Sequence, residues 1–112
     1  MIEQAVEQWR RFVVGDASAL DDLLAEDAVF YSPVVFTPQR GKEITNVYLQ
    51  GAAQVLGGTD FRYIKQVLAG REAILDFETT VDGKHVKGVD IMTCNENGRI
   101  VGFRSCCDRC RP

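Results

Sequence analysis

Three of the four cysteines lie within residues 106–110, inside the C-terminal segment SCCDRCRP. A structural zinc site uses four thiolate or imidazole ligands, usually supplied as two C-x2-C pairs or as Cys and His mixtures. Cys107 and Cys110 form one such pair, and the remaining candidates at a distance are Cys94 and His85. Because this is half of a zinc motif, we predict no metal site and no cofactor. Exposed thiols without a special function are kept as an alternative.

An aspartate within an apolar strand is the second candidate for chemistry. In residues 85–94 the alternation of a strand places Asp90 on one face with Met92 and Cys94, while the other face is also largely apolar. A carboxyl group in such a place is near a sheet edge, is paired, or lines a cavity. It acts in catalysis, or it only accepts hydrogen bonds and closes a pocket, and both interpretations stay open. Three aromatic side chains are the expected partners: Trp9, Tyr31 and Tyr48.

The single histidine, His85, follows the turn signal Asp82-Gly83, and we interpret it as a solvated residue at the end of that turn. A chain with one histidine in this position gives no Ser-His-Asp constellation. A water-activating set of Asp90 with Asp76 or Arg62 is not supported by the spacing either, because Asp76 alternates with apolar neighbours.

Apolar residues at three- and four-residue steps predict helices in the first half of the chain. Residues 2–13 form an amphipathic pattern that stops at Gly15-Asp16. A short helix follows with Leu20, Leu23 and Leu24 on one stripe, and Asp16 or Ser18 is the expected cap. A third helix is predicted for residues 42–56, with one apolar side listed here: Ile44, Val47, Tyr48, Ala52, Val55 and Leu56.

The second half changes to the period of strands. We predict strands at residues 61–70, 72–81, 85–94 and 99–104, after a brief strand at 28–31. Asp82-Gly83 and Asn97-Gly98 are hairpin signals. Residues 32–41, with two prolines and a glycine around Val35 and Phe36, are predicted to form an ordered loop with its own apolar anchor. Helices followed by an antiparallel meander predict a single α+β domain over residues 1–112.

Composition excludes several functional classes. The net charge of -3 and the pI near 5.1 give no basic surface for nucleic acid, so we predict no nucleic-acid partner. The N-terminus does not resemble a signal peptide, and no apolar run is long enough to span a membrane. We therefore expect a cytoplasmic protein without a membrane partner, in which thiols stay reduced.

Several stretches taken together resemble the NTF2-like superfamily, which includes nuclear transport factors, ketosteroid isomerases, limonene-epoxide hydrolase and SnoaL-like polyketide cyclases. The resemblance is carried by VGD at residues 14–16, LLAEDAVF at 23–30, Ser32-Pro33 with Arg40-Gly41, and GVD at 88–90 before NGRIV at 97–101. Within this superfamily the chain most resembles uncharacterised bacterial members with the motifs SPVVxTPQRG and VDGxHVxGVD. These motifs match residues 32–41 and 81–90. Those relatives commonly have His where this chain has Phe36.

The resemblance implies a cone in which three N-terminal helices pack on a curved antiparallel sheet and enclose an apolar pocket. It implies that function lies in the polar groups that point into the pocket, so that Asp90 and Tyr31 are the catalytic candidates. The expected pocket residues are Trp9, Phe30, Ser32, Val35, Phe36, Tyr48 and Met92. A homodimer through the sheet is the expected assembly.

In ketosteroid isomerases the position that resembles Asp90 holds a protonated aspartate, which donates a hydrogen bond because its apolar site raises its pKa. The general-base aspartate of those enzymes corresponds to Ser32 here, and an unassisted serine hydroxyl does not remove a proton from carbon at neutral pH. We therefore predict a domain that binds a small hydrophobic ligand. The alternatives are a SnoaL-like isomerase, cyclase or hydrolase with Asp90 as acid or hydrogen-bond donor, and a non-catalytic subunit-interaction domain.

The cysteine-rich ending has a further explanation. The relatives end on a pattern like FKVMLRPLQA, whereas this chain has Phe103-Arg104 and then residues 105–112. If residues 105–112 are encoded TCA TGC TGC GAC CGC TGC AGG CC, the frame that starts at the third base encodes MLRPLQA. We hypothesise that this atypical tail arose by a frameshift near Arg104, with a weakened sheet edge as the result. Reading the gene across this point tests the hypothesis: codons that do not yield that ending in the alternative frame would refute it.

Overall fold

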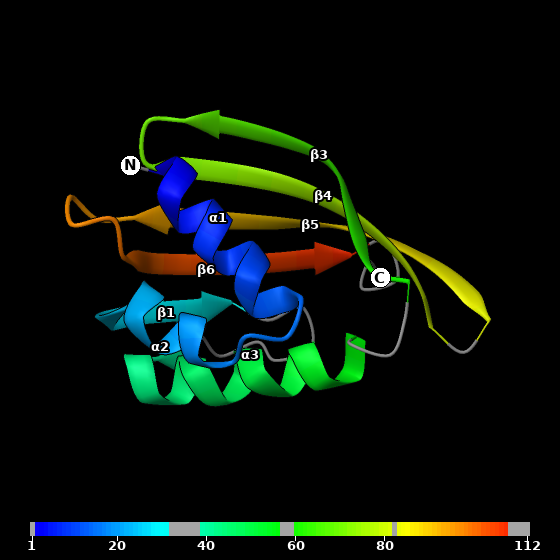
Figure 1. Ribbon diagram of the computed structural model, residues 1–112, viewed down its shortest axis with the longest axis horizontal. Coiled ribbons are helices and arrows are strands. Elements are labelled where there is room, and N and C mark those ends of the chain that lie inside the picture. The colour runs from blue at the N-terminus through cyan, green and yellow to red at the C-terminus, as the bar shows by residue number, and fades with distance from the viewer. Residues whose placement is uncertain (1, 32–38, 57–59, 82, 108–112) are drawn as a thin grey trace.

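The computed structural model describes residues 2–31, 39–56, 60–81 and 83–107 (Figure 1). The helices are α1 (Ile2–Val13), α2 (Ser18–Leu23) and α3 (Lys42–Leu56). The strands are β1 (Leu24–Tyr31), β2 (Gln39–Arg40), β3 (Arg62–Ala69), β4 (Glu72–Val81), β5 (Lys84–Cys94) and β6 (Ile100–Cys107). Among these residues, no helix is both long and apolar enough to cross a membrane.

The strands form one sheet in the order β2-β1-β6-β5-β4-β3. All neighbouring pairs are antiparallel except β1 and β6, which run parallel. The sheet is therefore mixed, and the prediction of an antiparallel sheet is wrong at this pair. The hairpins of the second half account for β3 to β6, but β1 joins β6 from the opposite end of the sequence, so no turn signal specifies its direction.

Helix α1 buries one stripe of side chains, as its period predicts, and lies across one face of the sheet (Figure 1). Ile2, Val6, Trp9 and Phe12 are 5% exposed or less. The helix ends before Gly15, whose φ of 125° is strained for residues with a side chain.

Two local predictions around α2 are wrong. Leu24 begins β1 rather than ending the helix, because β1 pairs with β6 from Leu24 onward. Neither predicted residue caps α2: the residue at the cap is Ala17, without a side-chain hydrogen bond. The Ser18 hydroxyl instead donates to the Asp16 carboxylate at 2.6 Å.

Helix α3 has the predicted bounds but turns a different side toward the sheet. Within residues 42–54, whose side chains the structure describes, Thr45 and Leu49 are buried, and the Thr45 hydroxyl bonds to backbone carbonyl oxygens of β1 and β2. Ile44, Val47 and Tyr48, which the sequence places on the apolar side, are 39%, 64% and 38% exposed. The buried side differs from the expected one because a threonine can be buried when its hydroxyl has hydrogen-bond partners. A pattern of apolar residues does not reveal such partners.

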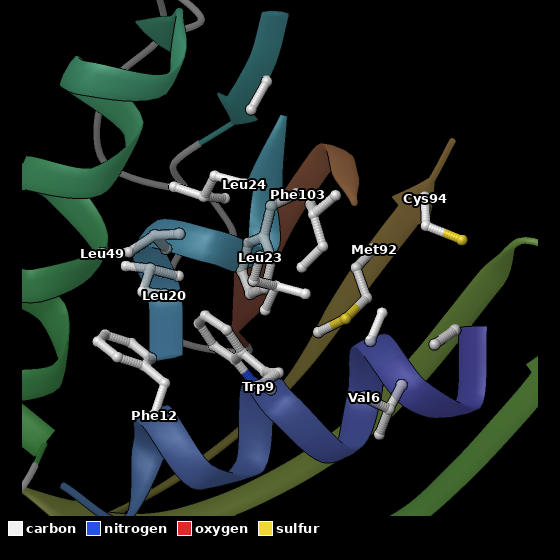
Figure 2. Packing of buried hydrophobic residues seen from close by; sticks show 14 of the residues in the cluster. Val6, Trp9, Phe12, Leu20, Leu23, Leu24, Leu49, Met92, Cys94 and Phe103 are labelled. Atoms are coloured by element: carbon white, nitrogen blue, oxygen red, sulfur yellow. The ribbon is translucent and has the colours of Figure 1, made fainter. Parts of the chain in front are cut away.

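The main core lies between α1, α2 and the inner face of the sheet (Figure 2). Met92 and Cys94 point into it from β5, and Phe103 joins them from β6. The centres of the Trp9 and Phe103 rings lie 4.7 Å apart with the rings tilted, so the centre of α1 packs against the middle of the sheet.

Strand β6 continues to Cys107 and lies between β1 and β5. Residues 105–107, assigned from the sequence to an atypical tail, thus pair with β5 in register, with Ser105 opposite Asp90. The described part of this tail therefore lies inside the sheet, because the edges of the sheet are β2 and β3.

Candidate functional site

A cavity of about 280 Å³ lies between α1, α3 and the inner face of the sheet. Its described lining is mostly aromatic and aliphatic, and three polar side chains lie together in it: Asp90, Tyr63 and Ser105. The other lining residues are Trp9, Phe12, Val13, Val14, Phe30, Leu49, Ala52, Ala53, Phe61, Phe77 and Phe103. An apolar hollow with a few converging polar groups is the usual form of a small-molecule site.

Asp90 is the centre of the polar group and is 5% exposed. The Tyr63 hydroxyl donates to Asp90 Oδ2 at 2.6 Å, and Trp9 Nε1 donates to the Tyr63 oxygen at 2.7 Å. Ser105, opposite Asp90 on β6, also forms a side-chain hydrogen bond to the carboxyl group. One buried chain of hydrogen bonds therefore runs from α1 through β3 to β5.

Burial raises the pKa of Asp90 to about 6, and the hydrogen bonds from Tyr63 and then Ser105 partly offset this rise. Burial also raises the pKa of Tyr63, and the neighbouring Asp90 charge adds to the effect, so this phenol stays protonated. At neutral pH Asp90 is mostly ionised and accepts hydrogen bonds. The donor role that the resemblance implies belongs to the protonated form of the same carboxyl group.

Strand β3 delivers Tyr63 to the site through an irregularity in its pairing with β4. The register shifts between Tyr63 and Lys65, and an irregularity of this kind re-aims the side chains beside it. The Phe61 ring lies edge-on to the Tyr63 ring at 5.1 Å, and the Arg10 guanidinium lies 5.3 Å from the centre of the Tyr63 ring. Arg10 also donates to Gln66 at 2.7 Å, so α1 and β3 are joined on both sides of the tyrosine.

The predicted site residues divide into three groups. Trp9 and Phe30 line the cavity together with Asp90. Ser32, Val35 and Phe36 lie outside the described residues.

The remaining predicted residues, Tyr31, Tyr48 and Met92, are not part of the described lining. The Arg104 guanidinium lies 4.7 Å from the centre of the Tyr31 ring. The centres of the Tyr48 and Phe30 rings lie 6.2 Å apart. Met92 is fully buried in the core.

Tyr63 is the functional candidate that sequence reasoning missed. A signal was present, since Phe61 and Tyr63 alternate with the charged Arg62 in a predicted strand. It was weak, because β3 is an edge strand in which most residues are exposed.

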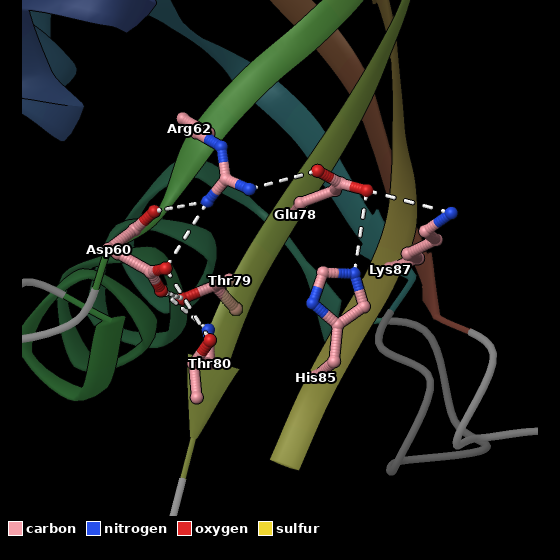
Figure 3. A network of polar contacts seen from close by, with 7 residues as sticks. All are labelled: Asp60, Arg62, Glu78, Thr79, Thr80, His85 and Lys87. Atoms are coloured by element: carbon pink, nitrogen blue, oxygen red, sulfur yellow. Dashed lines mark hydrogen bonds and ion pairs between the residues drawn. The ribbon is translucent and has the colours of Figure 1, made fainter. Parts of the chain in front are cut away.

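A second polar cluster lies where the start of β3, the end of β4 and the start of β5 meet, away from the cavity lining (Figure 3). Glu78 pairs with Arg62 at 3.0 Å, His85 at 3.4 Å and Lys87 at 3.6 Å. His85 is thus half exposed, as expected, but it contacts a carboxylate rather than solvent alone. Arg62 belongs to this cluster and does not reach Asp90, which excludes it from a water-activating set.

The Asp60 carboxylate accepts the backbone N–H of Thr80 at 2.7 Å and pairs with Arg62 at 3.3 Å (Figure 3). These bonds tie the start of β3 to β4. In the part of the chain that the structure describes, no group of three or more His, Cys, Asp or Glu side chains could hold a metal ion. The clustered cysteines lie at residues whose side chains are outside this description.

The chain belongs to the SnoaL-like domain family, whose signature matches residues 3–103. It is similar to a steroid delta-isomerase from Pseudomonas aeruginosa at 30% identity, with a TM-score of 0.87 over 99% of this chain and 80% of that chain. It is also similar to an NTF2-like protein of unknown function from Mesorhizobium loti at 28% identity, with a TM-score of 0.80 over 95% of this chain and 92% of that chain. No curated protein matches it significantly. The predicted α+β, NTF2-like fold is confirmed, with a curved and open mixed sheet.

Proposed function

We propose that the chain binds a small, mostly apolar molecule in the cavity beside Asp90. The observation that carries the proposal is the combination of about 280 Å³ of apolar-walled space with one buried carboxyl group. This volume corresponds to roughly nine water molecules at about 30 Å³ each, which suits a compact ligand of one or two rings. Desolvation of such a ligand against aromatic side chains supplies the affinity, and Asp90 supplies the orientation.

A substitution that fills the cavity tests this proposal without touching its polar groups. Ala53 is half-buried and lines the cavity, so Ala53→Phe places a ring in the proposed ligand space. The control is Gln54→Phe, the same side chain one position further on the exposed side of α3. We expect compounds that stabilise the wild type and Gln54→Phe in a thermal-shift screen to lose their effect on Ala53→Phe. Equal stabilisation of all three proteins would place the ligand elsewhere.

A second candidate function is proton-transfer catalysis on such a ligand. It is favoured by the pKa of about 6 that burial confers on Asp90, since a general acid or base works best near the ambient pH. The similarity to a steroid delta-isomerase supports the same class. Tyr63 takes the partner role proposed from the sequence for Tyr31, because Tyr63 is the tyrosine bonded to Asp90.

Deuterium exchange at the carbon beside the carbonyl of apolar ketones, followed by NMR, tests for this activity. We expect exchange with the wild type that Asp90→Asn abolishes. Binding without exchange would refute proton-transfer catalysis on these ketones and keep the binding function.

We also propose that two copies associate through the outer face of the sheet. Val67, Ile74 and Ile91 stand opposite one another in register on β3, β4 and β5, and the first two are 48% and 42% exposed. An apolar row of this kind suits a two-fold contact in which the same surface is used twice. Sedimentation of the wild type as a dimer and of Ile74→Asp as a monomer is the expected result. A monomeric wild type at high concentration would refute it.

A further inference from the structure

The side-chain donors in the described cavity wall are all engaged. Trp9 Nε1–H donates to Tyr63, the Tyr63 hydroxyl donates to Asp90, and the Ser105 hydroxyl bonds to the same carboxyl group. No other described lining side chain has a nitrogen or oxygen atom. A ligand whose only polar group is an acceptor, such as a ketone, therefore meets no free donor there.

Acceptor capacity remains at the carboxylate. An ionised carboxyl group has about four lone-pair positions, and Tyr63 and Ser105 occupy two of them at Asp90. The wall thus presents a hydrogen-bond acceptor to the cavity, so that the complementary ligand group is a donor.

The charge on this acceptor also has no close counter-ion. No lysine or arginine among the described residues forms an ion pair with Asp90. The nearby charged or titratable groups are Tyr63, which stays protonated, and Arg10, whose exposed guanidinium lies over the Tyr63 ring and donates to Gln66. A buried anion without a partner is costly, and a ligand cation would relieve that cost.

The rest of the wall suits a cation as well. The rings of Trp9, Phe30, Phe61, Phe77 and Phe103 line the same cavity as the carboxylate. Aromatic faces attract ammonium groups, and the attraction increases when water is excluded.

We propose that the cavity selects an apolar molecule that carries a protonated amine, with the ammonium group donating to Asp90 and the hydrocarbon body lying against the aromatic wall. This proposal rests on the ligand-binding function above and names the chemical class of the ligand. A hydroxyl group is the weaker donor for the same position, because it does not neutralise the carboxylate.

Three compounds of one shape compare the hydrogen-bonding roles that a ligand can have here. They are the amine (a cationic donor), the alcohol (a neutral donor) and the ketone (an acceptor) of indane, substituted at the same carbon. Calorimetric titration of the wild type at neutral pH should rank their affinities as amine, then alcohol, then ketone. Asp90→Asn should weaken amine binding by about 30-fold or more, as for the loss of one partner from a buried charge pair. Asp76→Asn removes the same charge from the outer face of β4 and should leave the amine affinity unchanged.

The pH dependence gives a second measurement that needs no variant. Because the pKa of Asp90 is about 6, the carboxyl group is ionised in about a tenth of the molecules at about pH 5, and amine affinity should fall about tenfold there. The alcohol should be nearly insensitive to this change.

The other outcomes refute different parts of the proposal. A ketone that binds more tightly than the amine would mean that Asp90 is protonated and donates, which refutes the amine class but keeps the pocket as a binding site. Amine binding that survives Asp90→Asn would refute the contact itself. Failure of all three compounds to bind would refute the amine class at this size, whereas the thermal-shift comparison of Ala53→Phe with Gln54→Phe separately decides whether the cavity binds an apolar molecule.

Discussion

Replacing Asp90 by asparagine should change how stability depends on pH. Burial raises the pKa of this carboxyl group from 3.8 to about 6, so the folded state binds its proton more tightly than the unfolded state does. The resulting stabilisation is fully present below the unfolded pKa and is lost as the pH rises through the folded pKa. A difference of about 2 pH units corresponds to about 3 kcal/mol at about 1.4 kcal/mol per unit.

The quantity to measure is the free energy of unfolding of the wild type minus that of Asp90→Asn. Urea titrations followed by the fluorescence of Trp9, the single tryptophan, provide it at intervals between about pH 4 and pH 8. We expect the difference to fall by about 2.5 kcal/mol across this range, most of the full difference, and to level off above about pH 7. Taking the difference cancels the titration of the other carboxylates.

Asp76→Asn is the matched control, because Asp76 lies on the opposite face of the neighbouring strand. Its comparison with the wild type measures the general effect of removing one carboxylate from the sheet. A flat difference between the wild type and Asp90→Asn would refute the reasoning, since it would mean that the carboxyl group is solvated or paired with a cation.

Three further substitutions test other parts of the structure. Tyr63→Phe removes a donor to Asp90 and should raise the pKa of that carboxyl group further, visible by NMR titration, while destabilising the fold by about 1–3 kcal/mol. Glu78→Gln breaks ion pairs with Arg62 and Lys87, which are half exposed, so the loss should stay below about 1 kcal/mol and shrink in high salt, as measured by urea unfolding. Leu75→Ala opens a cavity at a fully buried position and should cost about 2–5 kcal/mol in the same assay; a loss below about 1 kcal/mol would contradict its place in the core.

The local pattern of the chain predicted much of the fold because the pattern is repeated many times within each element. Helix α1 and strand β4 have the predicted bounds, and β5 extends the predicted strand by one residue. The Asn95–Gly98 turn also follows local rules, since Gly98 has a φ of 78° and the Asn95 side chain accepts two backbone N–H groups. The shared face of Asp90, Met92 and Cys94 on β5 was likewise predictable, because side chains alternate between the two faces of any strand.

The failures occur where a decision depends on distant residues. The direction of β1 against β6 joins segments from opposite ends of the chain, and the rotation of α3 depends on partners for the Thr45 hydroxyl. The periodicity of residues within β1 or α3 gives no sign of either feature. The sequence shows where the apolar residues are, but it does not show which polar side chains will find hydrogen-bond partners and so can be buried.

The candidate site shows the same division. The amino-acid sequence by itself determined that Asp90 lies on an apolar strand face, together with the family and its fold. Only the tertiary structure decided its chemistry, because Tyr63 is 27 residues distant and Ser105 comes from another strand. These partners, and the apolar rings that exclude water around them, make the group an acceptor with a pKa near neutrality rather than an ordinary surface carboxylate. Solvation and hydrogen bonding are properties of the assembled neighbourhood, and a strand's own sequence does not contain them.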